Sequence, residues 1–393
     1  MHPEIILKPG KEESLLRHHP WVFSGAIARM PENLDEGDYV CVKASDGRIL
    51  GAGHYQIGSI TVRILEFGQD SIPEDFFFTR LNNAAELRKT LNLIRPDNDC
   101  FRLVHGEGDF LPGLVVDIYG DTAVMQAHSP GMHFERNRIA EALTRLPGIK
   151  IRNVYYKSET TLPFKARLDP HNDYLIGGFD GNIATENGLM FNIDWLKGQK
   201  TGFFVDQREN RSLLEKFAKD KTVLNMFCYT GGFSVYAMRG GAKSVDSVDS
   251  SAKAAALTDA NIALNFPQDN RHTTHAVDAF KFLADMPEDK YDLIVLDPPA
   301  FAKHRSALKN GLIGYRKLNA KAFEKIKPGG ILFTFSCSQV VTREAFRLAV
   351  FSAAAKSGRK VRVLHQLTQP ADHPFDISHP EGEYLKGLVL SVE

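Results

Sequence analysis

The sequence predicts an α/β protein whose C-terminal half is an open, mostly parallel sheet of seven strands. Strands and helices alternate from about Asn192 onward, which is the pattern of a doubly wound, Rossmann-like sheet. The last two predicted strands have no helix between them, so the final strand is expected to join the sheet antiparallel. The chain of 393 residues is also too long for one ordinary core, so two or three domains are expected.

Three segments of different character follow one another along the chain. Residues 1–75 contain short alternating apolar runs broken by glycine and acidic turns, which favours a small β-barrel. Residues 76–190 combine helical periodicity with a hairpin pattern, which indicates a compact α+β domain with an architectural role. Residues 191–393 hold the predicted seven-stranded sheet. We therefore expect three domains with these boundaries.

The periodicity of apolar residues locates the elements of each segment. In the first segment we expect strands at residues 5–8, 39–43, 49–52 and 60–65. In the second we expect a helix at 76–93, a hairpin of 114–119 with 122–126, a helix at 134–146 and a strand at 151–156. In the third we expect strands at 222–227, 244–248, 275–277, 291–296, 330–335, 361–367 and 384–392, and helices at 206–219, 233–239, 250–265, 279–286, 318–326 and 343–357.

The composition excludes several classes of protein. No apolar run approaches the length of a membrane span, and the first residues lack a charged-then-apolar signal, so a cytoplasmic protein is expected. The four cysteines, Cys41, Cys100, Cys228 and Cys337, form no Cys-x-x-Cys pair. Neither a zinc cage nor a disulfide framework is therefore expected, and no metal is predicted.

The charge is balanced over the whole chain but not along it. The 48 basic and 48 acidic residues cancel, while residues 1–75 carry −5, residues 76–190 carry −1 and residues 191–393 carry +6. A nucleic-acid contact would therefore come from local patches, chiefly in the last segment. The basic residues expected to contact phosphates are Lys303, Arg305, Arg316 and Lys317, with a solvated loop and helix as the alternative.

The ends of the first three predicted strands of the sheet suggest a cofactor pocket. Gly231 and Gly232 follow the first strand and allow a close backbone approach to a ligand, although a tight strand-to-helix turn would need them too. Gly-x-Gly-x-x-Gly is absent, which favours S-adenosylmethionine over a pyrophosphate cofactor. Asp249 and Asp278 follow the next two strands. Their carboxylates suit a ribose diol and an adenine amino group, or they cap the following helices.

The ends of the next two strands carry residues suited to chemistry. Asp297-Pro-Pro-Ala-Phe301 follows the fourth strand, and its prolines stiffen the loop and remove two backbone donors. Cys337 follows the fifth strand, which lies beside the fourth in a sheet of this type. A thiolate is a good nucleophile. With S-adenosylmethionine, this pair indicates methylation of a pyrimidine carbon, which becomes nucleophilic only after a thiol adds to the ring.

Motifs along nearly the whole chain resemble the bacterial large-subunit ribosomal RNA cytosine-5 methyltransferase I family. In the last segment these are residues 197–211, Asn-x-Phe-x-Tyr-Thr-Gly-Gly-Phe at 225–233, Asp-Pro-Pro-Ala-Phe at 297–301, Thr-Phe-Ser-Cys-Ser at 334–338, Ala-Asp-His-Pro at 371–374 and Pro-Glu-Gly-Glu-Tyr-Leu-Lys at 380–386. The stretch 17–25 resembles that family's PUA domain, and 101–117 its central domain.

The resemblance implies a site and a mechanism. It implies that Cys337 is the nucleophile. In the reaction that we expect, its thiolate adds to C6 of a cytosine in RNA, and Asp297 holds or protonates N3 of the ring, where charge develops. It places the following residues around S-adenosylmethionine: Asp206, Arg208, Asn225, Tyr229, Gly231, Asp249, Asp278 and Asp297.

Other functions stay open on the sequence alone. One is methylation of an adenine or guanine nitrogen through the Asp-Pro-Pro loop, without a covalent adduct. Another is a ribosome-assembly protein that binds RNA without catalysis. A nicotinamide dehydrogenase is disfavoured by the missing glycine pattern. The modified nucleotide is not readable, and a homodimer is left open.

Overall fold

A computed structural model describes residues 2–163 and 166–393. The chain divides into two compact units. The N-terminal unit comprises the chain up to Asn187 together with residues 193–205 and 371–382, and the C-terminal unit comprises residues 188–192, 206–370 and 383–393. The loop 371–382 therefore belongs to the N-terminal unit, although both of its flanks belong to the C-terminal one. The domain boundaries at 75/76 and 190/191 stay predictions.

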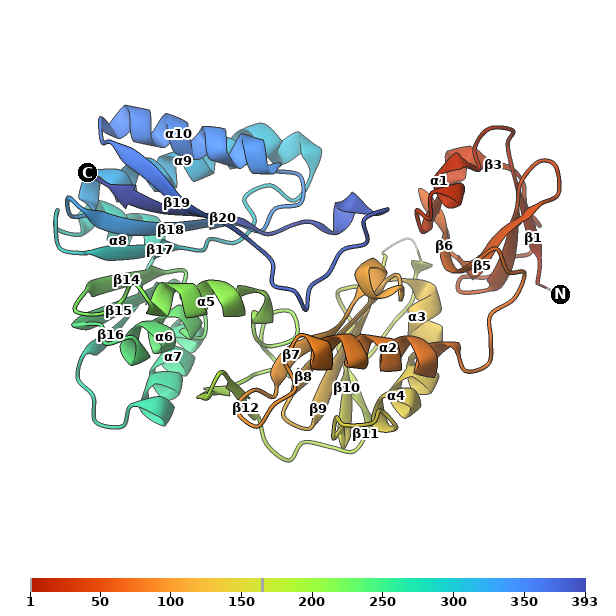
Figure 1. The fold of residues 1–393 in the computed structure, drawn as a ribbon, viewed down its shortest axis with the longest axis horizontal. Coiled ribbons are helices and arrows are strands. Elements are labelled where there is room, and N and C mark those ends of the chain that lie inside the picture. The colour runs from red at the N-terminus through yellow and green to blue at the C-terminus, as the bar shows by residue number, and fades with distance from the viewer. Residues whose placement is uncertain (1, 164–165) are drawn as a thin grey trace. The chain divides into compact units, whose positions relative to one another are not determined.

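A six-stranded sheet begins the N-terminal unit, in the order β2-β6-β5-β4-β1-β3 (Figure 1). Alternate residues of its strands, such as Val40 and Val42, point into one small core. The β-rich first segment predicted from the sequence is thus confirmed. Its elements are β1 Glu4–Leu7, α1 Glu13–Leu16, β2 Trp21–Phe23, β3 Ile27–Arg29, β4 Tyr39–Lys43, β5 Ile49–Tyr55 and β6 Ile60–Phe67.

A five-stranded sheet in the order β11-β10-β9-β8-β7 completes the N-terminal unit. The predicted hairpin is present as β8 and β9, paired antiparallel around Gly120 and Asp121. The predicted helix at 76–93 ends earlier, because Asn92 adopts a left-handed backbone conformation, φ 54°. This part of the unit contains α2 Phe76–Thr90, β7 Cys100–His105, β8 Leu114–Tyr119, β9 Thr122–Ala127, α3 Pro130–Phe134, α4 Arg136–Thr144, β10 Asn153–Tyr156 and β11 Asp173–Ile176, with β12 Ile183–Glu186 outside the five-stranded sheet.

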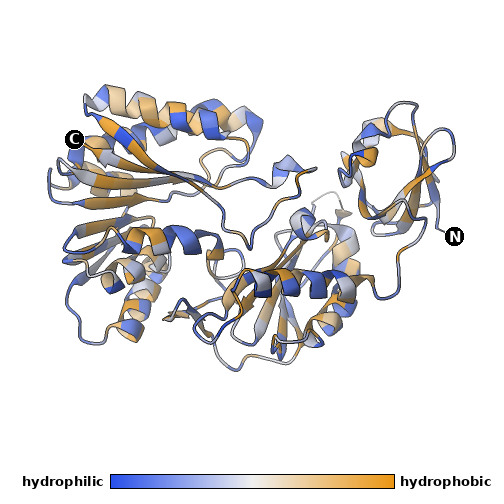
Figure 2. Ribbon diagram, in the orientation of Figure 1, coloured by the Kyte–Doolittle hydropathy of each residue, from blue (hydrophilic) through white to orange (hydrophobic). Residues whose placement is uncertain are grey.

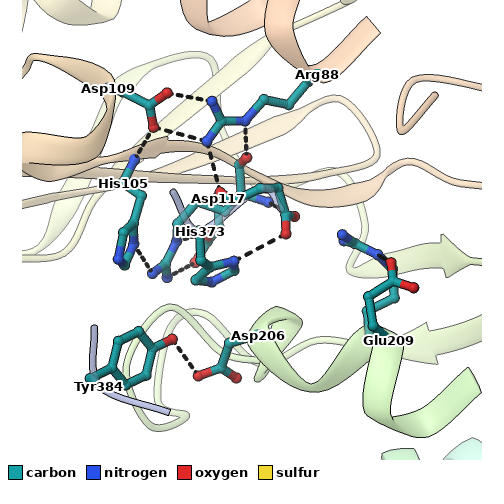
Figure 3. A network of polar contacts seen from close by, with 11 residues as sticks. Arg88, His105, Asp109, Asp117, Asp206, Glu209, His373 and Tyr384 are labelled. Carbon is teal, nitrogen blue, oxygen red and sulfur yellow. Dashed lines mark hydrogen bonds and ion pairs between the residues drawn. The ribbon is translucent and has the colours of Figure 1, made fainter. Parts of the chain in front are cut away.

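A buried ion pair fixes the loop 371–382 within the N-terminal unit (Figure 3). The guanidinium of Arg88 contacts both carboxylate oxygens of Asp109, one of them at 2.8 Å, and donates to the main-chain oxygen of Asp372 at 2.7 Å. The carboxylate of Asp372 in turn accepts from the amide of Arg102 at 3.0 Å. Buried charges are tolerated only when they are paired and hydrogen-bonded in this way.

The C-terminal unit is built on a seven-stranded sheet in the order β16-β15-β14-β17-β18-β20-β19. Neighbours are parallel from β16 to β18, and β20 is antiparallel to both β18 and β19. The predicted seven strands and the final antiparallel strand are confirmed. The strands are β14 Thr222–Met226, β15 Ser244–Asp249, β16 His272–Ala276, β17 Leu293–Leu296, β18 Gly330–Ser336, β19 Val361–Thr368 and β20 Lys386–Val392, with β13 Leu189–Asn192 outside this sheet.

Helices flank this sheet, and its central strands are hydrophobic (Figures 1 and 2). Helices α8, α9 and α10 share one apolar core with strand residues such as Leu296 and Leu332. The helices are α5 Arg208–Glu215, α6 Gly232–Arg239, α7 Ala252–Asn265, α8 Ala279–Asp285, α9 Leu308–Lys325 and α10 Arg343–Ser357. Within residues 2–163 and 166–393, no helix has the length and apolar character needed to cross a membrane.

Helix α9 starts ten residues before the predicted Leu318, at Leu308. Gly311 and Gly314 lower the helix propensity of this first part. Packing explains why they are tolerated: a Cβ at Gly311 would lie 2.8 Å from the Cβ of Ala302, and one at Gly314 would lie 2.9 Å from the ring of Phe301. The glycines thus let α9 pack closely against the loop that follows β17.

Candidate functional site

The residues predicted to form the site follow neighbouring parallel strands of the C-terminal unit. Strand register places Met226 of β14 beside both Val248 of β15 and Leu296 of β17, and Leu296 beside Thr334 of β18. The loops after these strands therefore emerge at one edge of the sheet. Ligands bind at this edge in open α/β folds.

The loop after β14 folds back tightly on itself. Phe227, Tyr229 and Gly231 all have positive φ, of 60°, 49° and 76°, and the amide of Gly231 donates to the carbonyl of Cys228 at 2.8 Å. A Cβ at Gly231 would lie 2.6 Å from the methyl carbon of Thr258. Glycine is therefore required here by packing against α7, in addition to any close approach to a ligand.

The carboxylates after β15 and β16 are bound by the protein's own backbone. Asp249 accepts from the amide of Tyr229 at 3.0 Å and from the amide of Ser251 at 2.9 Å. Asp278 accepts from the amide of Lys281 at 2.8 Å and caps α8. Asp249 is half-buried and Asp278 is exposed. Each carboxylate oxygen has a second lone pair, so these residues can also accept hydrogen bonds from a ligand.

A second group of polar residues surrounds Asp297. The hydroxyl of Tyr384 donates to Asp206 Oδ2 at 2.6 Å (Figure 3), whereas Asp206 Oδ1 is buried and has no hydrogen-bond partner among the described residues. The side chain of Gln207 donates to Asp297 at 3.0 Å and accepts from Asn210 at 2.6 Å. Burial, and next the nearby charge of Asp206, raise the pKa of Asp297 to about 7.

Asn225 and Arg208 lie deeper in the C-terminal unit. The side-chain amide of Asn225 donates to Ser234 at 2.9 Å, and its oxygen is buried without a partner in the described part of the chain. Arg208 is buried at the start of α5, and its Nε lies 3.4 Å from Glu209. The buried acceptors on Asp206 and Asn225 fit a ligand rich in hydrogen-bond donors, such as the ribose and amino groups of S-adenosylmethionine.

Cys337 lies half-buried directly after β18, next to a buried lysine. The register of β18 with β20 places Lys386 opposite Ser336. The Lys386 ammonium donates to the carbonyls of Ser338 at 2.5 Å and Val341 at 2.7 Å. Burial lowers the pKa of Lys386 to about 8, although the charge of Cys337 favours the ammonium form.

Tyr315 of α9 connects the loops after β17 and β18. Its hydroxyl accepts from Ser336 Oγ at 2.9 Å and from the amide of Phe301 at 3.4 Å. Burial raises the pKa of Tyr315 to about 12, and the charges of Cys337 and Asp297 act in the same direction. The predicted nucleophile and the predicted acid therefore both lie close enough to Tyr315 to influence it electrostatically.

The predicted phosphate-binding residues are all exposed. Lys303 lies in the loop after β17, Arg305 in a following 3₁₀ turn, and Arg316 and Lys317 on α9. Phe301, in the same loop as Lys303, is half-buried, and the centroid of its ring lies 4.7 Å from that of Tyr315.

Four residues of the site were not predicted as such: Gln207, Tyr315, Tyr384 and Lys386. Tyr384 and Lys386 lie in the stretch 380–386, which the sequence marked only as a shared motif. Their position follows from the final antiparallel strand, because β20 must begin where β18 ends. Gln207 likewise lies in the shared stretch 197–211, whereas Tyr315 has no comparable sequence signature.

Comparisons with known proteins show the family of the chain. The family model for S-adenosylmethionine-dependent methyltransferases matches residues 129–388, and that for PUA-like domains matches residues 5–67. The chain is 41% identical over 397 residues to a ribosomal RNA large subunit methyltransferase I from Shewanella denitrificans and 38% identical over 396 residues to one from Tolumonas auensis. Each alignment covers 99% of both proteins.

Solved structures share the fold. A protein from Streptococcus mutans, assigned to the S-adenosylmethionine-dependent methyltransferases, superposes with a TM-score of 0.83 at 24% identity, covering 99% of this chain and 100% of that one. A methyltransferase solved in complex with SAH gives 0.84 at the same identity and coverage. At this identity the likeness supports the fold alone.

Proposed function

Because the chain belongs to the ribosomal RNA large subunit methyltransferase I family of S-adenosylmethionine-dependent enzymes, we propose that it methylates C5 of a cytosine in large-subunit ribosomal RNA. One observation carries the choice of cytosine C5. Cys337 and Asp297 follow adjacent parallel strands, and both lie close to Tyr315. A nucleophile for C6 and an acid for N3 are two of the groups that this reaction needs.

The proposed cofactor site uses the residues at the carboxyl edge of the sheet. Asp206, Asn225 and Asp249 offer acceptors to the hydroxyl and amino groups of the cofactor, and the loop through Tyr229 and Gly231 forms its backbone wall. Arg208, Asp278 and Asp297 complete the proposed set. S-Adenosylmethionine supplies an electrophilic methyl group when it is bound.

The reaction begins at the sulfur of Cys337. The thiolate forms a bond to C6 of a cytosine turned out of its stack, and N3 gains the electron density that Asp297 stabilises by a hydrogen bond or a proton. C5 is then nucleophilic enough to accept the methyl group. Loss of the C5 proton to a base restores the C5–C6 double bond and expels the Cys337 thiolate. The proton given to N3 returns to Asp297 as the thiolate leaves, so both residues are regenerated, and the cofactor would be released as S-adenosylhomocysteine.

The pKa of Asp297 and one further residue, Lys386, support these roles. The pKa of about 7 keeps a large fraction of Asp297 protonated near neutral pH, as an acid at N3 requires. The negative charge of Cys337 favours the ammonium form of Lys386, and this attraction is mutual. Lys386 therefore stabilises the thiolate before attack and after its expulsion.

RNA is proposed to lie against the exposed basic residues Lys303, Arg305, Arg316 and Lys317, where phosphates can be bound without sequence recognition. The PUA-like residues 5–67 would add a second contact, despite the −5 charge of the first segment. A cytoplasmic location is part of this proposal, since ribosomal RNA is its substrate.

The decisive experiment traps the intermediate. RNA containing 5-fluorocytosine has no C5 proton to lose, so turnover should stop at a covalent protein–RNA complex that survives denaturing electrophoresis. Formation should require S-adenosylmethionine, and Cys337→Ala should form none. Methyl transfer to RNA without any adduct would favour nitrogen methylation. S-Adenosylmethionine binding without transfer would favour a non-catalytic RNA-binding protein.

Nitrogen methylation through the Asp-Pro-Pro loop has less support. That chemistry uses an aromatic ring after the prolines to stack the base, whereas Phe301 is one residue further along and packs on Tyr315. Stacking on Phe301 would require the ring to leave this contact.

A further inference from the structure

His19 meets two residues from the far end of the sequence within the N-terminal unit. His19 precedes β2, and His379 and Glu381 lie in the loop 371–382. The Nε2 atoms of the two histidines lie 3.6 and 3.7 Å from the same oxygen, Glu381 Oε2. One possible ligand atom from each of the three lies within 4.8 Å of the others. Their chemistry is that of a transition-metal site rather than of the methyl-transfer site.

His379 supplies an independent indication of a ligand. Its side chain is only 4% exposed, and neither ring nitrogen has a hydrogen-bond partner among the described residues. The His379 ring packs edge-on against the apolar ring of Trp21, with 4.3 Å between the two ring centroids. Buried polar atoms are nearly always paired. A cation bound between this imidazole, the second imidazole and the carboxylate would give a buried ring nitrogen of His379 the partner that it lacks.

The spacing suits zinc. Zinc bonds of about 2.0–2.1 Å to nitrogen and about 2.0–2.2 Å to oxygen, in tetrahedral geometry, place neighbouring ligand atoms about 3.3–3.5 Å apart. The two histidine-to-carboxylate separations of 3.6 and 3.7 Å need only a small contraction, and the ligand atoms of the two histidines, which lie within 4.8 Å of one another, must also move closer. Two imidazoles and one carboxylate also form a donor set that zinc commonly takes, with a fourth position open to water.

We propose that His19, His379 and Glu381 bind a zinc ion. Zinc binding breaks one weak hydrogen bond. The Trp21 amide donates to His19 Nδ1 at 3.3 Å, and this nitrogen must carry the proton when Nε2 binds the metal. The nearby guanidinium of Arg63 does not oppose a cation strongly, because it is paired with Glu107 at 2.6 Å.

The metal has a structural role in this proposal. His19 lies next to the first sheet of the N-terminal unit, and the other two ligands lie in a loop from the far end of the sequence. A shared zinc ion holds the loop at its second half, while Arg88 holds its first half through Asp372. The open coordination position does not by itself indicate a catalytic role for the ion. The inference does not depend on the proposed methyl transfer.

Zinc binding by the full-length, untagged protein tests the proposal. After treatment with a chelator, the wild type should bind one zinc ion per chain in competition with a chromophoric chelator. His379→Gln and Glu381→Gln should each weaken binding by about 10–100-fold or more. His171→Gln is the matched control, because its side chain is 81% exposed and lies 3.9 Å from Asp169, and this pair has no third possible ligand among the residues that the structure describes. This control should bind zinc like the wild type.

Two further measurements keep the result unambiguous. Cobalt in place of zinc should give visible bands without a thiolate charge-transfer band, since no cysteine is a ligand. Zinc should raise the midpoint of thermal unfolding in the wild type and His171→Gln and not in Glu381→Gln, whose half-exposed side chain makes folding failure a poor explanation. Equal zinc affinity in all four proteins, or a thiolate band with cobalt, would overturn the proposal.

Discussion

Two sets of acidic residues lie at the same edge of the seven-stranded sheet and differ in what holds them. Asp249 and Asp278, after β15 and β16, accept hydrogen bonds from backbone amides of their own loops. Asp297, after β17, and Asp206 accept hydrogen bonds from the side chains of Gln207 and Tyr384 instead, and one oxygen of Asp206 is buried without a partner in the described chain.

We infer from this difference that the first set fixes the shape of the loops and that the second set takes part in the reaction. An amide that donates to a carboxylate stabilises its charged form and fixes the loop. A desolvated carboxylate beside another negative charge is instead driven toward its protonated form, as the pKa of about 7 at Asp297 indicates. Perturbed groups of this kind mark the part of a site that performs chemistry. We therefore expect substitutions in the second set, with Cys337, to affect catalysis, and those in the first to affect binding or stability.

The largest expected effect is at Cys337. Replacing it with alanine removes the proposed nucleophile, so methyl transfer to RNA should fall by about 10³-fold or more. S-Adenosylmethionine affinity, measured by calorimetry, should stay within about threefold, which corresponds to less than 1 kcal/mol. Turnover at the native rate in single-turnover assays would refute the covalent route.

Asp297 should come next, with an effect that depends on pH. Asp297→Ala should lower methyl transfer by about 10²-fold at neutral pH, the scale of a lost general acid. The wild-type rate should decline as pH rises through about 7, because the protonated carboxyl is then lost. Asp297→Asn should abolish this decline, since the amide does not titrate.

The same pKa shift affects stability with a definite sign. The pKa rises from 3.8 in the unfolded chain to about 7 in the folded one, so the folded state binds more protons between these values and loses stability as pH rises from about 4 to 7. Asp297→Asn should therefore gain stability over the wild type across this interval in urea titrations. A constant difference would argue against the raised pKa.

Asp249 should have an intermediate effect that is confined to the cofactor. Asp249→Ala removes the acceptor for the amides of Tyr229 and Ser251 together with the proposed ribose contact. We expect S-adenosylmethionine affinity to fall by about tenfold or more, the scale of one charged hydrogen bond. The rate at saturating cofactor should change little. A large loss of this rate would contradict the expectation that Asp249 acts in binding and not in catalysis.

The smallest effect is expected at Asp278, which is exposed and caps α8. Asp278→Ala should cost about 1 kcal/mol of unfolding free energy. Asp278→Asn, which keeps a capping oxygen, should recover most of this loss. If Asp278→Asn binds S-adenosylmethionine much more weakly than the wild type, the residue contacts the cofactor through its charge.

The sequence predicted the architecture better than the surroundings of the site. Alternating strands and helices indicated the seven-stranded sheet and its antiparallel final strand, because these depend on local periodicity. The first part of α9 was missed, since Gly311 and Gly314 lower helix propensity and only packing on the loop after β17 stabilises it there. The proximity of Gln207 to Asp297 and of Lys386 to Cys337 depends on tertiary contacts. His19 and His379, about 360 residues apart, could not be paired from the sequence.

The position of β20 has a consequence for how the protein is made. This strand follows all the others in the chain, yet it lies between β18 and β19 and provides all the pairing between them. Until β20 has been synthesised, β18 and β19 therefore each have an unpaired backbone edge that can form hydrogen bonds with other chains. A nascent chain interrupted before β20 would lack both Lys386 and the strand that seals the sheet, so such fragments should be aggregation-prone and inactive.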